Sequence, residues 1–358
     1  MGLEAAPPDT RDLATQQGAQ SRPRRWLSLL LFALLAGLIP ETIATNSTSV
    51  AKILTDPLSL VAVAIFYGTA DLFIREIIIR RRPRLAAKVL LGVAFGFVNE
   101  GVVAGTWYTV KPDGYAFVHG IDWSWAVSLT VFHLFVSVLI PVYLFDSVMP
   151  ALAGVPLLRR RGMIVTSVVF VAFSSLAFFA PHDRLQRAAV FLVALALAAI
   201  ALRLPPKRTA SSMPVRFAPG LWRLRCLGFL AMLVYFVCIY LLPALFARAN
   251  QRIGAASAAP ALVANAILLG LAGWALALGA SWARSPAWSR RQTLALISGA
   301  LAFSILVSFL PPLIATWEPL ATVPFGVYLI ILAWRNRADG MRTAVEAPSR
   351  VCDSVFLP

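Results

Sequence analysis

The sequence predicts an all-α integral membrane protein with about ten transmembrane helices and with both termini in the cytoplasm. Three observations lead to this fold class: the composition, the number of long apolar stretches, and the placement of the basic residues. Of the 358 residues, 59% are hydrophobic and 13% are charged, and the mean hydropathy is +0.77. A typical soluble domain is about half apolar and about a quarter charged. The composition therefore excludes an ordinary soluble domain.

The second observation is a series of apolar stretches, most of them near the ~20 residues that a membrane-spanning helix needs. Charged or Pro- and Gly-rich connectors separate them, and the connector at residues 181–184 is so short that a helical hairpin is expected. The expected spans are residues 26–45, 58–79, 87–107, 123–149, 163–180, 185–203, 221–247, 260–282, 293–314 and 317–334.

These spans divide the chain into four regions. Polar tails that contain proline occupy both ends, and such segments are expected to be disordered. The regions are a cytoplasmic tail at residues 1–25, a four-helix region that bears the polar residues at 26–150, a six-helix apolar region at 151–334, and a second cytoplasmic tail at 335–358.

The third observation is the placement of lysine and arginine. With the N-terminus in the cytoplasm and alternating spans, 25 of the 32 basic residues fall in cytoplasmic segments and six in outer segments, with Arg75 inside a span. Cytoplasmic loops of membrane proteins carry this excess. We therefore expect a protein of the cell's inner (plasma) membrane, surrounded by the lipid bilayer. The net charge of +16 is then a topology signal, and no nucleic-acid partner is expected.

The three cysteines are widely spaced and form no CxxC motif. This pattern predicts neither a disulfide framework nor a cysteine-based metal motif. We expect no metal site and no cofactor.

Polar residues inside the spans are the first candidates for function, because a charge at mid-membrane costs roughly 2.5–3.5 kcal/mol on insertion scales. Their distribution is uneven, since the last six spans hold almost none apart from Asn265. Glu41 and Asp146 lie at the ends of the first and fourth spans. The second to fourth spans hold Asp71, Arg75, Glu76, Asn99, Glu100 and His133.

Tyr67, Asp71 and Arg75 follow one another at intervals of four residues, which places them on one stripe of the second helix. One interpretation is that Asp71 and Arg75 form an ion pair within the helix that neutralises both charges. The other is that all three line a binding site. Glu76 is rotated away from this stripe, toward the headgroups, where it is either exposed at the membrane surface or part of the same site.

Glu100 lies in the segment GFVNEGVVAG, whose glycines allow close helix approach. It could act as a proton carrier, base or ligand, or it could be a protonated packing residue. Asn99 precedes it. Helix depth at 1.5 Å per residue allows Asp71, Glu100 and His133 to share one level of the membrane.

His133, Ser137 and Pro141 also follow one another at intervals of four residues. Pro141 has no N–H to donate to the carbonyl of Ser137, so we expect a kink in the helix and a free acceptor there. His133 either shuttles protons near neutral pH or only hydrogen-bonds a neighbouring helix. His119, in the preceding outer loop, is expected in a solvated turn.

The first 150 residues resemble a group of prokaryotic multi-pass membrane proteins without an assigned function. The resemblance rests on IPE, DPLSLVAVAIFYG, LFIRE, LLGVAFGFVNEG, IDWSWAVSLTVFH and SVLIPVYLFDSVMP. It implies two successive acids where this chain has Asn99 and Glu100.

The same helices are partly similar to the type II CAAX prenyl protease (CPBP) family, which pairs an E-E-x-x-x-R motif with intramembrane histidines. This similarity implies that Glu100 is the second acid and that His133 lies on the first histidine-bearing helix. The chain departs from the motif at Asn99 and at Gly105, and no second intramembrane histidine follows.

Three functions follow from these residues, in order of preference. The first is a transporter for a small or amphipathic solute, with a carboxyl or histidine proton coupled to its movement. The second is a CPBP-like intramembrane protease or lipid-modifying hydrolase that acts on a lipid-like substrate, with Glu100 as general base and His133 as its partner. The third is a non-catalytic scaffold. The expected chemical residues are Glu100 and His133, and the expected binding residues are Tyr67, Asp71, Arg75, Glu76, Asn99 and Ser137.

Overall fold

The computed structural model is helical throughout, apart from one short hairpin among the residues that it describes. These residues are 25–44, 56–109, 117–179, 183–205, 219–241, 259–282 and 288–307. The elements are α2 (Arg25–Leu38), η1 (Ile39–Ala44), α4 (Pro57–Arg81), α5 (Leu85–Gly96), η2 (Phe97–Ala104), η3 (Thr106–Tyr108), β1 (Phe117–Val118), β2 (Ile121–Asp122), α6 (Trp123–Phe132), η4 (His133–Leu139), α7 (Ile140–Val148), η5 (Pro150–Leu152), α8 (Arg160–Ser175), η6 (Leu176–Phe179), α9 (Arg184–Arg203), α10 (Leu221–Phe236), η7 (Val237–Leu241), α12 (Ala259–Trp282) and α13 (Arg290–Val307).

Eight helices of the described chain are long and apolar enough to cross a membrane, and they coincide with the first eight predicted spans. They are Arg25–Ala44, Pro57–Arg81, Leu85–Ala104, Trp123–Val148, Arg160–Phe179, Arg184–Arg203, Leu221–Ile239 and Val263–Trp282. The predicted ninth span overlaps α13. The rest of that span, the tenth span at 317–334 and the two predicted tails lie outside the described residues, apart from Arg25.

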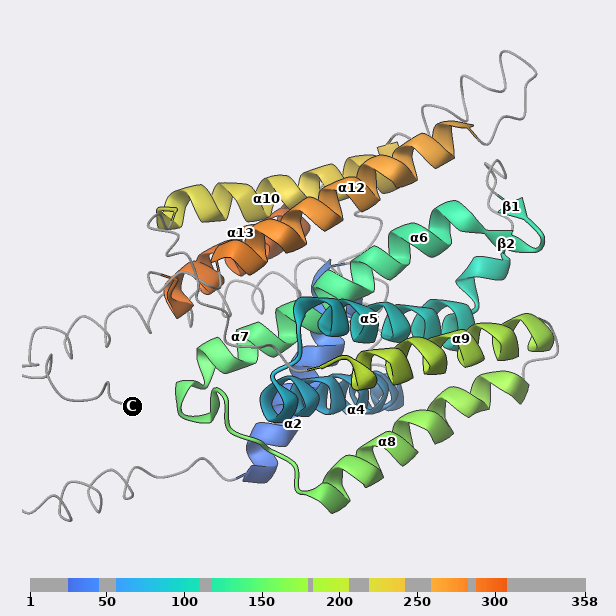
Figure 1. Cartoon of the computed structure of the whole chain (residues 1–358), viewed down its shortest axis with the longest axis horizontal. Coiled ribbons are helices and arrows are strands. Elements are labelled where there is room, and N and C mark those ends of the chain that lie inside the picture. Colours follow the sequence, from blue (N-terminus) through green and yellow to red (C-terminus); the bar gives the residue numbers. More distant parts are fainter. Residues whose placement is uncertain are drawn as a thin grey trace, which may run out of the picture.

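The helices form a central group that is covered on two sides. Figure 1 shows α4 and α5 in the middle, α8 and α9 on one side, and α10, α12 and α13 as a layer on the other. In the central group α2 packs on α4, while α8 packs on α4 and α9 on α5. In the outer layer α10 packs on α13, and α13 contacts α7 and η1. The second to fourth spans therefore have other helices packed on both sides of them.

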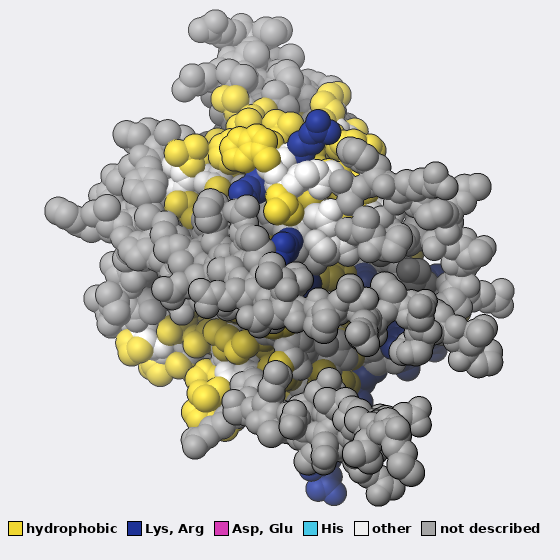
Figure 2. Space-filling model, turned by 90° about the vertical axis from the view of Figure 1, so that its left-hand side faces the viewer, with side chains coloured by type: hydrophobic (Ala, Val, Ile, Leu, Met, Phe, Trp, Pro, Cys, Tyr) yellow, Lys and Arg dark blue, Asp and Glu magenta, His cyan; other side chains and the backbone are white. Residues whose placement is uncertain are grey.

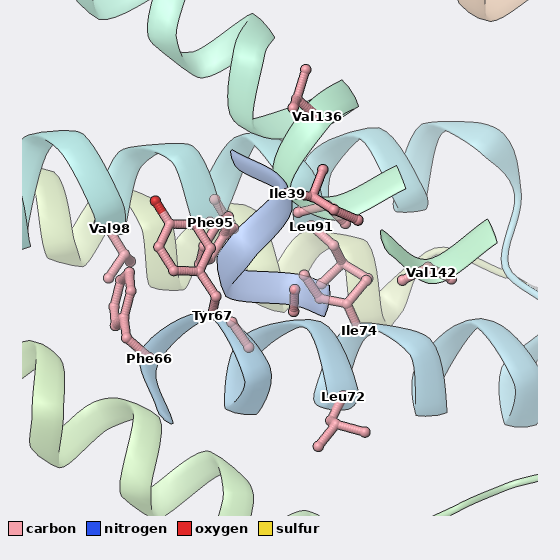
Figure 3. Packing of buried hydrophobic residues seen from close by; sticks show 14 of the residues in the cluster. Ile39, Phe66, Tyr67, Leu72, Ile74, Leu91, Phe95, Val98, Val136 and Val142 are labelled. Carbon is pink, nitrogen blue, oxygen red and sulfur yellow. The ribbon is translucent and has the colours of Figure 1, made fainter. Parts of the chain in front are cut away.

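The core of the central group is built from large apolar side chains between α2, α4, α5 and α7. Figure 3 shows Phe66 and Tyr67 of α4 beside Phe95 and Val98 of the neighbouring span. All four are at most 4% exposed. Large apolar residues on α8 and α9 instead face outward, such as Val168 at 60% exposure. Many large apolar side chains of these two helices are exposed in this way, and such an extended apolar surface suits contact with lipid.

Glycine lets α5 approach the helix that carries His133. A Cβ atom on Gly96 would lie 3.1 Å from Cα of Thr130 and 3.3 Å from Cβ of His133, closer than nearly all real contacts of a Cβ atom. The close helix approach predicted from the glycines of this segment is confirmed at Gly96. The glycine therefore brings the two polar helices within side-chain reach of one another.

Three of the four central spans change from α-helix to π-helix partway along. The π-helical segments are η1, η2 and η4. η4 ends two residues before Pro141, and the N–H of Ile140 donates to the carbonyl of Phe135, five residues earlier. The kink expected at Pro141 stays a prediction. Short π-helical segments occur frequently at functional sites. Glu41, Asn99, Glu100, His133 and Ser137 all lie on these segments.

The two ends of the helix bundle differ in charge. At the first, which we call the basic end, the connectors carry Arg81, Arg84 and the arginines at 159–161. Figure 2 faces this end, and the charged side chains in view are Lys and Arg. The other end, called the hairpin end, carries β1 and β2, which pair antiparallel (Figure 1). His119 lies exposed in the hairpin turn with φ 52°, as predicted.

Candidate functional site

Glu100 and His133 form the centre of a polar site between η2 and η4. Oε1 of Glu100 lies 2.7 Å from Nε2 of His133. The histidine side chain is 3% exposed and the glutamate side chain 12%. The histidine ring is held edge-on by Phe95 and Phe132, with ring centroids 5.8 and 5.3 Å away. Glu100 and His133, which helix depth allowed to share one level of the membrane, are therefore in direct contact.

Ser137 completes the hydrogen bonding of the histidine ring. Its Oγ lies 2.7 Å from Nδ1 of His133, one helical turn away. A hydroxyl can donate to a neutral imidazole nitrogen or accept from a protonated one. The ring of His133 therefore keeps both hydrogen bonds whether it is neutral or charged, and a proton can move between His133 and Glu100 without breaking either contact.

Asn99 joins this centre to the second and first spans. Its Nδ2 lies 3.2 Å from Nδ1 and 3.1 Å from Nε2 of His133, and it donates to Oη of Tyr67 at 2.6 Å. The hydroxyl of Tyr67 donates in turn to a carboxylate oxygen of Glu41. Asn99 and Tyr67 are buried, at 5% and 2% exposure. The side chains of four spans thus meet in one hydrogen-bonded system.

The site reaches the hairpin end through Glu100. Thr106 of η3 donates to Oε2 of Glu100. Arg187 of α9 donates to the carbonyl oxygens of Val102 and Val103 at the end of η2, and so satisfies acceptors that a helix end leaves open. Glu100 is four residues, or about 6 Å, from the hairpin end of its span. The site is therefore deeply buried at Ser137 and partly exposed at Glu100.

Tyr108 lies outside the span, at this end. Burial raises the pKa of Tyr108 to about 12, although the neighbouring Arg187 lowers it in part. The guanidinium of Arg187 lies 5.7 Å from the centroid of the Tyr108 ring. The tyrosine therefore remains neutral at physiological pH.

We call this hydrogen-bonded system the relay network. It consists of Glu41, Tyr67, Asn99, Glu100, Thr106, His133 and Ser137. Five of the eight predicted site residues belong to it. Sequence reasoning placed Glu41 at the end of a span without a role, and it missed Thr106. Neither residue lies three or four positions from the residue that it contacts, so helical spacing gave no signal for either.

Arg75 and Glu76 belong to a second polar group, at the basic end. The guanidinium of Arg75 donates to Oδ1 of Asp146 from Nη2 at 2.6 Å and from Nε at 3.0 Å. It also donates to the carbonyl oxygens of Leu152 and Val155. The predicted ion pair between Asp71 and Arg75 is therefore wrong, because the arginine side chain reaches across to α7 and the following connector.

Glu76 is buried rather than exposed at the membrane surface. Its Oε1 accepts the N–H groups of Leu157 and Leu158, and its Oε2 accepts from Arg80 at 2.9 Å. The side chain is fully buried. Arg75, Glu76, Arg80 and Asp146, which we call the connector cluster, fix residues 149–159 between α7 and α8. The contacts of Arg75 and Glu76 are those of structural residues.

Asp71 belongs to neither group. It is fully buried, and neither oxygen of its carboxyl group has a hydrogen-bond partner among the described residues. It therefore does not meet Glu100 and His133 directly, although Tyr67, one turn away, is part of the relay network.

The described residues contain no group of three or more His, Cys, Asp or Glu side chains that could hold a metal ion together. The relay network offers groups that exchange protons: two carboxyls, one imidazole and three hydroxyls. Carboxyl and histidine chains of this kind inside a membrane mark proton relays and ion or substrate pathways.

Comparison with known proteins gives one match. A family model described as an uncharacterized membrane protein family matches residues 30–344. Neither the curated proteins nor the solved structures include a match to the chain. The matched range contains the whole relay network and Asp71. The resemblance expected for the first 150 residues is thus confirmed and extends much further, while the similarity to the CPBP family stays a prediction.

Proposed function

Since the chain belongs to an uncharacterized membrane protein family, we propose that it is a transporter that couples the movement of a small or amphipathic solute to protons. The hydrogen bond between Glu100 and His133 carries this proposal. A carboxyl and an imidazole are costly to place within a membrane span, so such residues are rare there and mark candidate functional sites. Their contact gives a proton two adjacent sites, both within reach of a solute that enters from the hairpin end.

The burial of the relay network supports coupling. Ser137 and Asn99 are at most 5% exposed, whereas Glu100 is partly open. A solute that binds near Glu100 changes the electrostatic environment of His133, so that proton loss and solute binding depend on one another. This linkage is what a coupled transporter requires.

The proposed orientation follows from the arginine-rich connectors. With the basic end in the cytoplasm and ten spans in the cell's inner membrane, both termini are cytoplasmic. Glu100 then takes protons and solute from the outer side.

The test uses purified protein in sealed lipid vesicles that contain a pH-sensitive dye. Amino acids, short organic acids, choline and amphipathic amines are added in turn, and proton movement is recorded. We expect at least one class to move protons in the wild type and none in Glu100→Gln. The control is Asp56→Asn, which makes the same chemical change at an exposed carboxyl directly before α4. No response to any class, or a response that survives in Glu100→Gln, contradicts the proposal.

A second candidate is a hydrolase of a lipid or peptide bond in the membrane. The arrangement of Ser137, His133 and Glu100 favours it, because a carboxylate that orients an imidazole can activate a water or a hydroxyl. A hydrolase would cleave its substrate in detergent, where no gradient exists, and mass spectrometry of added bacterial lipids and peptides detects the products. If Glu100→Gln and His133→Ala change only the stability, the scaffold function replaces both candidates.

A further inference from the structure

We propose that Asp71 is a proton-binding site that joins the relay network to the connector cluster, so that a proton can travel along α4 between them. The carboxyl group of Asp71 is fully buried, and neither oxygen has a hydrogen-bond partner in the part of the chain that the structure describes. An ionised carboxylate in such a place costs far more than a neutral carboxylic acid. Asp71 is therefore suited to hold a proton and release it only when the surroundings change.

The position of Asp71 divides the distance between the two groups. Tyr67, Asp71 and Arg75 lie on one stripe of α4, and four residues correspond to about 6 Å along the helix. Tyr67 is part of the relay network and Arg75 contacts Asp146. Without Asp71, about 12 Å of apolar helix would separate these groups. With it, each step is short enough for about one bridging water, which transmits hydrogen bonds nearly as well as direct contact.

Among the charged, histidine and tyrosine side chains of the described residues around α4, Asp71 is the one that lies between the two groups. The elements that pack against α4 are α2, α5, η4, α7 and α8. Their Asp, Glu, His, Lys, Arg and Tyr residues are Arg25, Lys88, His133, Tyr143, Asp146, Arg160 and Arg161. All except His133 lie toward the basic end, and His133 belongs to the relay network.

The proton balance of the route is simple. Asp71, which is neutral at rest, first gives its proton toward Asp146, whose side chain is 24% exposed at the basic end. The carboxylate left on Asp71 then takes the hydroxyl proton of Tyr67, and Tyr67 regains a proton from Glu100 and His133 through a bridging water, since an amide such as Asn99 does not transfer protons. Each transfer breaks one O–H or N–H bond and forms another, and no other reactant is needed. The route deepens the proposed function and rests on it for its purpose, which is coupling to a solute.

The protonation of Asp71 can be measured without a known solute. Infrared spectra of the full chain in lipid are compared for the wild type, Asp71→Asn and the control Asp56→Asn. We expect a carboxylic-acid band at neutral pH that Asp71→Asn removes and Asp56→Asn retains. If Asp71→Asn removes no such band, the inference is overturned, because an ionised Asp71 is not a proton store.

The connection to the relay network is tested by exchange in heavy water. The band of Asp71 is isolated as a difference between infrared spectra. The spectrum of Asp71→Asn is subtracted from that of the wild type, and the spectrum of the double variant Tyr67→Phe/Asp71→Asn is subtracted from that of Tyr67→Phe. Loss of the tyrosine hydroxyl should slow exchange of the Asp71 proton by about tenfold, because one step of the route is removed. Equal exchange rates with and without the hydroxyl overturn the connection.

The vesicle assay separates this inference from the proposed function. Solute-driven proton movement that persists in Asp71→Asn overturns the inference while the transporter proposal stands. Conversely, if no solute moves protons but the band and its exchange behave as expected, the proton site stands and the transporter proposal fails. Movement driven by a sodium gradient without protons contradicts the proton-coupled transporter, and the infrared band and its exchange then decide whether the proton site stands.

Discussion

Two partners of Arg75 can be compared by experiment: the one predicted from helical spacing and the one in the structure. A double-mutant cycle measures the coupling energy of each pair. One cycle combines Arg75→Met with Asp146→Asn, and the other combines Arg75→Met with Asp71→Asn. The structure places the two nitrogens of Arg75 at 2.6 and 3.0 Å from one oxygen of Asp146. The first cycle should therefore give a large coupling energy and the second almost none.

The magnitude follows from the burial of the pair. Removal of one partner from a buried ion pair costs about 3–5 kcal/mol, because a charge is left without compensation. The side chain of Arg75 is fully buried, but that of Asp146 is 24% exposed, so solvent screens part of the interaction. We expect a coupling energy of about 2 kcal/mol for Arg75 and Asp146. For Arg75 and Asp71 it should stay within about 0.5 kcal/mol, the usual error of additivity.

The assay is unfolding of the purified variants in mixed micelles, followed by circular dichroism as the denaturing detergent is increased. Arg75→Met alone should be strongly destabilised, because it also leaves the carbonyl oxygens of Leu152 and Val155 without a donor. A coupling energy to Asp71 that equals or exceeds the one to Asp146 would refute the pairing in the structure and restore the one predicted from the sequence.

Three further predictions concern the surroundings of the site. Gly96→Ala should cost about 1–3 kcal/mol of stability, because its Cβ atom has no room beside His133; thermal unfolding measures this, and a neutral effect would contradict the close approach. Arg187→Met should lower the free energy of unfolding by about 1–3 kcal/mol, because it leaves the helix-end carbonyls without a donor. The control Arg161→Met changes an exposed arginine and should have little effect in the same measurement. The pKa of Tyr108 is about 12 in the folded protein and its ordinary value is 10.0. Between these values the tyrosine keeps its proton in the folded state and loses it in the unfolded state, so the free energy of unfolding should fall as the pH rises through this window. Tyr108→Phe should flatten that fall, and identical pH profiles of the two proteins would argue against burial of the ring.

The spans could be read from the sequence because the bilayer leaves few alternatives. A chain that crosses lipid must satisfy its backbone internally, so each long apolar stretch becomes a helix. The absence of an N–H in Pro141 predicts a kink in the fourth span. The π-helical segment η4 was not predicted, because it depends on how this helix packs against its neighbours, and helical spacing contains no information about that packing.

The candidate site was predicted in part. Spacing correctly placed Tyr67, Asp71 and Arg75 on a buried face of one helix, and the rarity of intramembrane acids singled out Glu100. Helical spacing predicted the wrong partner for Arg75, because a long side chain reaches other helices as easily as the next turn of its own helix. It also gave no signal for Thr106.

The sequence by itself determined which helices are polar, because ionisable residues are costly inside lipid and therefore stand out in the apolar spans. Tertiary structure alone decided which polar groups meet. Tyr67 and Glu41 are 26 positions apart and Arg75 and Asp146 are 71 apart, and contacts over such separations depend on how whole helices pack. The same packing left Asp71 between two hydrogen-bonded groups without a partner of its own in the described residues.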